Sequence, residues 1–145
     1  MATIMRRMNV ISRCESIYRT EQSADRLPGI YHSYILAICR QPGTTQDRLA
    51  KHLCNNKSSV TRHLSFLEKG GYVKRRVCEK DRREMQVYPT EKMLAVLPEV
   101  RRITLEWNAL IAQGIPEEEL AVFHSVLDRM LEKSQEIVYG QEVNE

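Results

Sequence analysis

Apolar residues recur with a helical period at both ends of this 145-residue chain. Near the N-terminus, apolar positions three or four residues apart predict a helix over about residues 4–22. A wider apolar stripe begins at about residue 90 and continues, after a break at Gly114-Ile115-Pro116, to about residue 140. These long helices carry more apolar surface than the middle of the chain can cover. We therefore expect them to form the core of a homodimer.

The middle of the chain predicts three shorter helices. The first, over about residues 31–41, is apolar enough to be buried. The second begins after Thr44 or Thr45, because a threonine hydroxyl can cap a helix. Asn56 is an equally good N-cap for the third, which ends at Gly70-Gly71 with a glycine in the left-handed conformation.

Two short strands follow these helices. Residues 72–78 and 83–88 alternate in polarity on either side of a charged turn. The order of elements predicts a mainly α fold with a small β-wing: a winged helix-turn-helix with long N- and C-terminal dimerisation helices. We expect a single domain with these bounds: the whole domain 1–145, a DNA-binding lobe at about 31–92, and dimerisation helices at about 4–22 and 90–140.

Positive charge is concentrated in the predicted lobe. Residues 40–92 contain thirteen Lys and Arg against six Asp and Glu, whereas the rest of the chain has nine against thirteen. Such a segregated basic segment is the electrostatic footprint expected of a protein that binds double-stranded DNA. A helix pair followed by a basic hairpin places one helix in the major groove and the hairpin tip beside the backbone or in the minor groove.

Several short motifs in this segment occur together. They are Leu49-Ala50, Val60-Thr61-Arg62, the LEKGGYV run at residues 67–73, and Asp81-Arg82-Arg83. With these motifs in register, nearly the whole chain closely resembles the MarR family of bacterial transcriptional regulators, although Pro89 stands where that family usually has leucine. The resemblance implies a cytoplasmic winged-helix homodimer that binds palindromic DNA, usually represses transcription, and responds to a small-molecule or redox signal.

The exposed face of the helix after Asn56 supplies most of the candidate DNA contacts. Small hydroxyls let a helix start approach base edges, and Arg62 can bond a guanine with two hydrogen bonds. At the turn, Asp81 can pair with Arg83, while Arg82 or Arg83 enters a narrow minor groove. There are three alternatives to these DNA contacts: the serines only cap the helix, Arg62 is a solvated surface charge, and the hairpin is held by ion pairs without touching DNA. The predicted DNA-binding residues are Thr45, Gln46, Lys57, Ser58, Ser59, Thr61, Arg62, Lys74, Arg82 and Arg83, with Asp81 stabilising the wing.

A candidate effector pocket lies between the predicted first, second and fifth helices. Cys14, Tyr18, Tyr34 and Ile38 could line a crevice for an aromatic ligand. Some members of the family that the chain resembles sense organic peroxides through a cysteine of the first helix near tyrosines of the second, here Tyr31 and Tyr34. The alternative is that Cys14 is a small buried apolar residue, as most free cysteines are.

Other classes of site have little support in the sequence. The four cysteines form no CxxC pair and the four histidines show no metal-ligand spacing, so we expect no metal, no cofactor and reduced cytoplasmic thiols. The sequence has no run of about 18 apolar residues, so we expect no membrane-spanning helix. No catalytic motif stands in a plausible context, so we expect no enzyme activity.

The leading hypothesis is therefore a sequence-specific transcriptional repressor of a palindromic operator, relieved by a small-molecule effector. An activator or an architectural DNA-binding protein would share the same interface. A cysteine-based redox-sensing repressor is one alternative. A helical protein-interaction module whose basic face binds an acidic partner is another.

Overall fold

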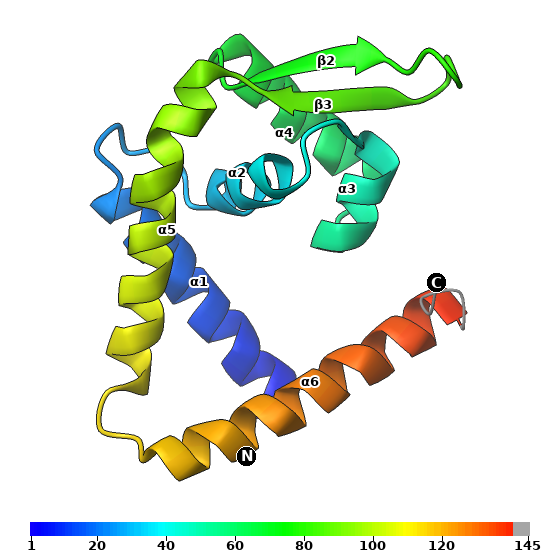
Figure 1. The fold of residues 1–145 in the computed structure, drawn as a ribbon. Helices are drawn as coiled ribbons and strands as arrows, with labels where there is room; N and C mark the ends of the chain where they lie inside the picture. Colours follow the sequence, from blue (N-terminus) through cyan, green and yellow to red (C-terminus); the bar gives the residue numbers. More distant parts are fainter. Residues whose placement is uncertain (141–145) are drawn as a thin grey trace. The chain divides into compact units, whose positions relative to one another are not determined.

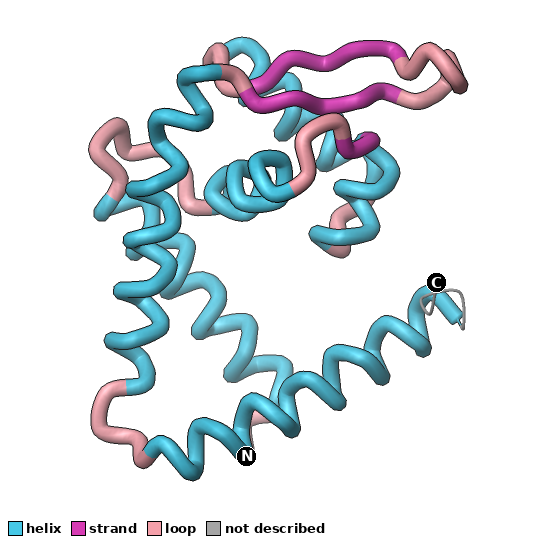
Figure 2. The backbone as a smooth tube through the Cα atoms, viewed as in Figure 1, coloured by secondary structure: helices cyan, strands magenta, loops and turns pink. Residues whose placement is uncertain are grey.

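The computed structural model describes residues 1–140 as parts of two compact units, Met1–Trp107 and a second that begins at Asn108. The predicted mainly helical fold with a small antiparallel sheet is confirmed (Figure 1; Figure 2). The elements in chain order are α1 (Ile4–Gln22), α2 (Ile30–Arg40), β1 (Thr44–Thr45), α3 (Gln46–Leu53), α4 (Lys57–Lys69), β2 (Val73–Val77), β3 (Met85–Pro89), α5 (Glu91–Ala112) and α6 (Glu117–Tyr139).

The core of the first unit lies where α2, α3, α4, α5 and the sheet meet. One face of α4 is buried completely, because Val60, Leu64 and Leu67 are each 0% exposed. They pack in one apolar cluster with Ile35 of α2 and Val87 of β3, among others. Burying a side chain of this size stabilises the fold by roughly 1.5–3 kcal/mol. The core thus fixes the orientation of α4 and leaves its opposite face to solvent.

Local capping sets where α3 and α4 begin. The Thr45 hydroxyl accepts a hydrogen bond from the Arg48 amide at 3.2 Å, and the Asn56 side chain accepts one from the Ser59 amide at 2.8 Å. Both are N-caps that the sequence predicted. Between the two helices, Cys54 takes a left-handed conformation with φ of 51°, which makes the sharp turn of the helix pair.

The sheet is antiparallel in the order β1-β3-β2. In the wing, β2 pairs with β3 in a register that places Arg75 opposite Val87. The two-residue strand β1 pairs with the other edge of β3, so it links the start of α3 to the wing. The sequence did not predict β1, because two residues cannot show the alternation that marks a strand.

The end of α4 and the start of α5 meet at the base of the wing. Gly71, with φ of 80°, makes the left-handed turn, whereas Gly70 keeps a helical φ of −74°. The Thr90 hydroxyl donates to the Gly71 carbonyl at 2.6 Å. Farther along, α5 continues through Pro98, and the Trp107 ring packs against Tyr18 of α1 with centroids 5.4 Å apart.

The second unit contains the end of α5 and all of α6. Pro116 is the N-cap of α6 and not part of its first turn, which carries three glutamates. No described residue of α6 is buried. Its exposed apolar side chains are Val122, Phe123, Val126, Leu131, Ile137 and Val138. None of the helices within residues 1–140 is long and apolar enough to cross a membrane.

Candidate nucleic-acid interface

The face of α4 opposite the core is polar and open to solvent. Burial of Val60, Leu64 and Leu67 turns the remaining positions of the helix outward. The predicted contact residues of this helix share that face: Lys57, Ser58, Thr61 and Arg62 are exposed, and Ser59 is half-buried. The structure therefore brings these five together on one solvent-facing surface.

Hydrogen bonds along α4 show how its polar side chains are held. The side chain of Asn56 is the N-cap acceptor of the helix, so the hydroxyls of Ser58 and Ser59 do not serve as the cap. The Ser58 hydroxyl donates to the Asn56 side chain at 2.8 Å, and Arg62 donates to the Ser59 hydroxyl at 3.2 Å. Arg62 thus lies along the helix with an exposed guanidinium, which keeps four of its five N–H groups available to a base edge.

At the start of α3, the side chains of Thr45 and Gln46 both bond to other parts of the protein. The Thr45 side chain is 7% exposed, and its hydroxyl caps α3. Gln46 is half-buried, and its side-chain oxygen Oε1 accepts a hydrogen bond from the Arg75 guanidinium at 3.3 Å. Both side chains therefore position α3, and their contacts with DNA stay a prediction.

Arg75 is a residue that sequence reasoning missed. From β2 it donates to both carboxylate oxygens of Glu68, at 3.2 and 3.1 Å, and to the Ser65 hydroxyl at 3.3 Å, in addition to Gln46. These hydrogen bonds from Arg75 hold the pKa of the Glu68 carboxyl below its usual value. One guanidinium therefore joins the wing, α4 and the start of α3.

Strand alternation was the signal that could have found Arg75. Lys74, Arg75 and Arg76 are consecutive basic residues of β2, and because strand side chains alternate between two faces, at least one of them must point away from the others. In the structure Lys74 is exposed, and the Arg76 guanidinium lies 5.2 Å from the centre of the Tyr88 ring. Only Arg75 of the three points toward α4.

The tip of the wing contains the predicted ion pair. The Arg83 amide donates to Asp81 at 3.0 Å, and its guanidinium donates to the same carboxylate at 3.2 and 3.5 Å. These bonds, the backbone one foremost, hold the pKa of Asp81 below its usual value. Arg82 is exposed, and no hydrogen bond or ion pair within residues 1–140 engages it. Arg82 is therefore the arginine of the turn left available to a ligand.

Tyr34 links α2 to α4. Its hydroxyl lies 2.7 Å from His63 Nδ1 and accepts a hydrogen bond from the Asn55 side chain at 3.3 Å. Burial raises the pKa of the Tyr34 hydroxyl. The pKa of His63 is lowered, mainly by burial and also by the positive charge of Arg62. Cys14 is exposed on α1, so within a single chain it is not the small buried apolar residue of the alternative interpretation.

The four predicted effector-pocket residues lie in different surroundings. Ile38 is 0% exposed inside the core, and Tyr18 packs on Trp107. A cavity of about 350 Å³ does lie between α1, α2 and the turn after α3, but of the four predicted residues only Tyr34 lines it. Its wall includes Arg19, which donates to the Ser33 hydroxyl at 3.4 Å and pairs with Glu15.

Within residues 1–140, no cluster of three or more His, Cys, Asp or Glu side chains could hold a metal ion.

The fold is shared with known proteins. Residues 32–85 match the model of the MarR family. An uncharacterized HTH-type transcriptional regulator, YybA of Bacillus subtilis (strain 168), is 27% identical over 132 residues, which cover 90% of this chain and 87% of that protein.

Two solved structures from Listeria monocytogenes have the same fold. An uncharacterized SlyA-like transcription regulator superposes with a TM-score of 0.88 and 25% identity, covering 100% of this chain and 98% of that one. A MarR family regulator complexed with 26mer DNA gives a TM-score of 0.84 and 25% identity, covering 100% and 98%.

Proposed function

We propose that this chain is a transcriptional regulator of the MarR family, whose model matches residues 32–85, and that it binds double-stranded DNA through α4 and the wing. The observation that carries the proposal is the division of α4 into a fully buried apolar face and an exposed polar face bearing Arg62. The similar Listeria protein in complex with DNA supports it. In this proposal α4 enters the major groove, where Arg62 bonds the O6 and N7 atoms of a guanine.

The wing has a different task from α4. Arg82 is exposed at the turn that the Asp81–Arg83 pair stabilises, and Lys74 is exposed on β2. Arginine is favoured in a narrow minor groove, because the negative potential there is enhanced. We therefore assign Arg82 to the minor groove and Lys74 to phosphate contacts, which position the protein without reading sequence.

We further propose that the chain acts as a homodimer on a palindromic operator. The exposed apolar face of α6 needs a cover, and a second copy offers the same face in return. Two copies of α4 about one DNA turn apart, roughly 34–36 Å, would enter successive major grooves of a palindrome. Occupying an operator in this way would repress the gene beside it.

The proposed effector acts through Tyr34. The cavity that Tyr34 lines also includes Asn55, and the Tyr34 hydroxyl bonds both Asn55 and His63 of α4. A ligand that bonds the Tyr34 hydroxyl would compete with His63 and so change how α4 is held. Relief of repression by tenfold requires a preference of about 1.4 kcal/mol for the DNA-free arrangement.

A footprint on the DNA upstream of the gene that encodes this chain tests the proposal. We expect a protected palindrome, with affinity that falls by roughly 10³–10⁵ between about 50 and 200 mM salt if six to ten phosphates are contacted. Diffuse protection would indicate an architectural protein. No protection, or affinity independent of salt, would contradict DNA binding through the basic lobe.

A further inference from the structure

The backbones of α1 and of the residue before α2 approach each other closely at Gly29. The Cβ atom of an alanine at position 29 would lie 2.4 Å from the carbonyl oxygen of Ser16 and 2.9 Å from its Cα atom. Both distances are shorter than a Cβ atom tolerates, and the obstacle is backbone, which cannot rotate away. The φ and ψ of Gly29, −55° and −27°, suit any residue. Glycine is therefore required here for space and not for its conformational freedom.

Hydrogen bonds hold the two backbones together at this point. The Thr20 hydroxyl accepts from the Gly29 amide at 2.8 Å and donates to the Ser16 carbonyl at 2.9 Å. One turn into α2, Ser33 accepts a hydrogen bond at 3.4 Å from Arg19, which is 9% exposed. The start of α2 is therefore fixed to α1 by specific bonds as well as by close contact.

The loop between the two helices is also held in place. The Leu27 amide donates to the Ser23 hydroxyl at 3.3 Å, and Leu27 is 8% exposed in the core. The Ala24 amide donates to the Glu99 side chain of α5 at 3.0 Å. Because these bonds restrain the loop, a displacement at Gly29 should move α2 relative to α1.

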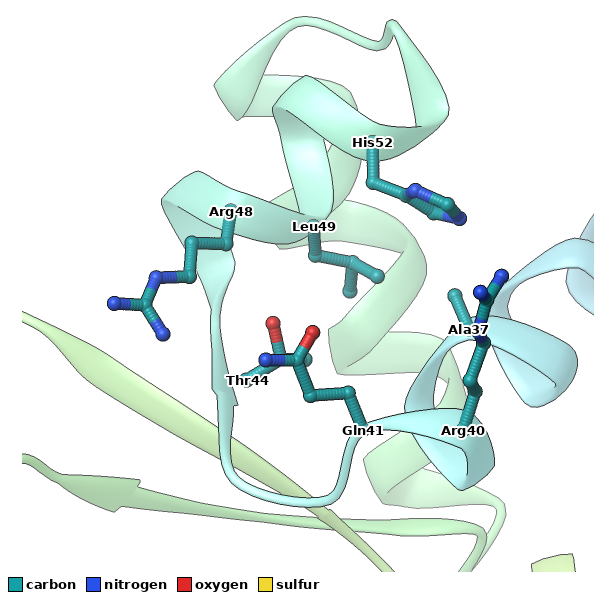
Figure 3. A pocket seen from close by; sticks show the side chains of 7 residues that line it. All are labelled: Ala37, Arg40, Gln41, Thr44, Arg48, Leu49 and His52. Carbon is teal, nitrogen blue, oxygen red and sulfur yellow. The ribbon is translucent and has the colours of Figure 1, made fainter. Parts of the chain in front are cut away.

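The other end of α2 has room for an added atom. A cavity of about 270 Å³ opens there between α2, β1 and α3, and Ala37 and Leu49 are among the residues that line it (Figure 3). One more heavy atom on Ala37 can enter this cavity, whereas one on Gly29 meets backbone. Substitutions of the same size at the two ends of one helix should therefore have different consequences.

A displacement of the start of α2 reaches α4 directly. Tyr31, two residues after Gly29, stacks on Phe66 of α4 with ring centroids 4.3 Å apart, and the Tyr34 hydroxyl lies 2.7 Å from His63 Nδ1. The first residue of α4 precedes Phe66 by nine positions, which is roughly 13 Å along a helix. A rotation of α2 on α1 therefore produces a larger movement at the end of α4 that carries the candidate DNA contacts.

We propose that the α1–α2 contact, formed by Ser16, Thr20 and Gly29, fixes the angle between α1 and the DNA-binding lobe and thereby sets which spacing of half-sites the dimer accepts. The inference rests on the proposed binding of a homodimer to a palindrome. In that dimer α1 lies on the side of the second copy, because apolar side chains such as Ile4 and Ile11 are 54% and 50% exposed in one chain. A change at the α1–α2 contact occurs once in each copy, so its effect on the distance between the two α4 helices is doubled.

The test measures binding of the full-length chain to the footprinted palindrome and to versions with one base pair more or fewer between the half-sites. One base pair moves a half-site by about 3.4 Å and turns it by roughly a tenth of a turn, so a mismatched dimer must deform the DNA. The wild type should prefer the footprinted spacing in fluorescence anisotropy. In Gly29→Ala, its preference over the better of the two altered spacings should fall by about tenfold. Affinity for random DNA and the mass of the dimer should not change.

Ala37→Ser is the matched control, because it adds one heavy atom to the same helix at the cavity of Figure 3. It should keep the spacing preference of the wild type. Thr20→Val keeps the shape of the side chain but removes the hydroxyl that bonds Gly29 and Ser16. It should also lower the spacing preference, and it decides the question if urea unfolding shows that Gly29→Ala does not fold.

Three results would overturn the inference. Equal weakening on all three palindromes, or an unchanged preference, in the deciding variant would mean that the α1–α2 contact does not set the spacing. The same loss of preference in Ala37→Ser would mean that the effect does not come from this contact. A wild type that binds all three palindromes equally would instead contradict the proposed palindromic operator, and the inference with it.

Discussion

Helices α4 and α6 both carry an apolar stripe, but a single chain covers only one of the two. In α4, Leu64 and its neighbours on the stripe are 0% exposed. In α6 no described residue is buried, and Phe123 and Leu131 are 53% and 55% exposed. The chain alone therefore completes the unit that presents α4, whereas α6 remains an unfinished surface. We attribute the difference to a second copy, which we propose covers α6 in solution.

The largest effect should come from making the face of α6 polar. In Phe123→Ser combined with Leu131→Ser, each protomer loses two apolar side chains worth roughly 1.5–3 kcal/mol apiece when buried. The dissociation constant of the dimer should then rise by about a hundredfold or more. Sedimentation at micromolar concentration should show the wild type at twice the mass of the chain and the variant at the mass of one chain.

Arg129→Ser is the control for this experiment, because Arg129 is an exposed polar residue of the same helix. It should leave the dimer intact. A wild type that sediments as a well-folded monomer would remove the proposed role of α6.

A core substitution in α4 should affect the folding of the lobe. Leu64→Ala leaves a cavity at a fully buried position and should lower the free energy of unfolding by about 2–5 kcal/mol. Thr61→Ala, on the exposed face of the same helix, should change it by no more than about 0.5 kcal/mol. Urea unfolding of both variants measures the difference, and similar losses would show that the two faces of α4 are not distinct.

The Arg75 network should matter for DNA affinity more than for stability. Its partner Glu68 is 42% exposed in the ion pair, so solvent screens much of the energy of that pair. Arg75→Gln should nevertheless weaken binding to every DNA sequence by about tenfold, because α4 and the start of α3 lose a shared anchor. Fluorescence anisotropy should show a smaller loss for Arg76→Gln, the neighbour that lies against Tyr88. Equal losses would mean that both arginines act through charge alone.

Acid should destabilise the first unit modestly through its histidines. Burial lowers the pKa of His63 and of His32 below the ordinary value of 6.5. The unfolded chain therefore binds more protons in this range, so the free energy of unfolding decreases as the pH falls through about 6.5 toward the folded pKa. His63→Gln should reduce this dependence in urea unfolding at about pH 7 and about pH 5. An unchanged dependence would assign it to other groups.

Features set by neighbouring residues could be predicted from the sequence. The caps at Thr45 and Asn56 depend on residues three positions away, and both are present. The bond from Tyr34 to His63 joins residues 29 positions apart, so it could not be predicted before the packing of α2 on α4 was known. For the same reason, the hydrogen bonds of Arg75 to α4 and to Gln46 could not be predicted.

The stripes of α4 and α6 show a second limit of sequence patterns. Apolar periodicity indicates that a face will be covered, but it does not say whether the same chain or another molecule covers it. The sequence predicted that Asp81 pairs with Arg83, but it left open which of Arg82 and Arg83 is available to DNA, because both are basic residues of one turn. That distinction required the hydrogen bonds of the structure.

The most direct test of the account compares Arg62→Ala with the wild type on the footprinted palindrome and on random DNA of equal length. If α4 reads bases through Arg62, binding to the palindrome should weaken by about 1–3 kcal/mol, and discrimination at one base pair of each half-site should relax. Binding to random DNA should change much less, because it depends mainly on phosphate contacts. Equal losses on both DNAs would place Arg62 on the backbone and contradict the claim that the exposed face of α4 reads sequence.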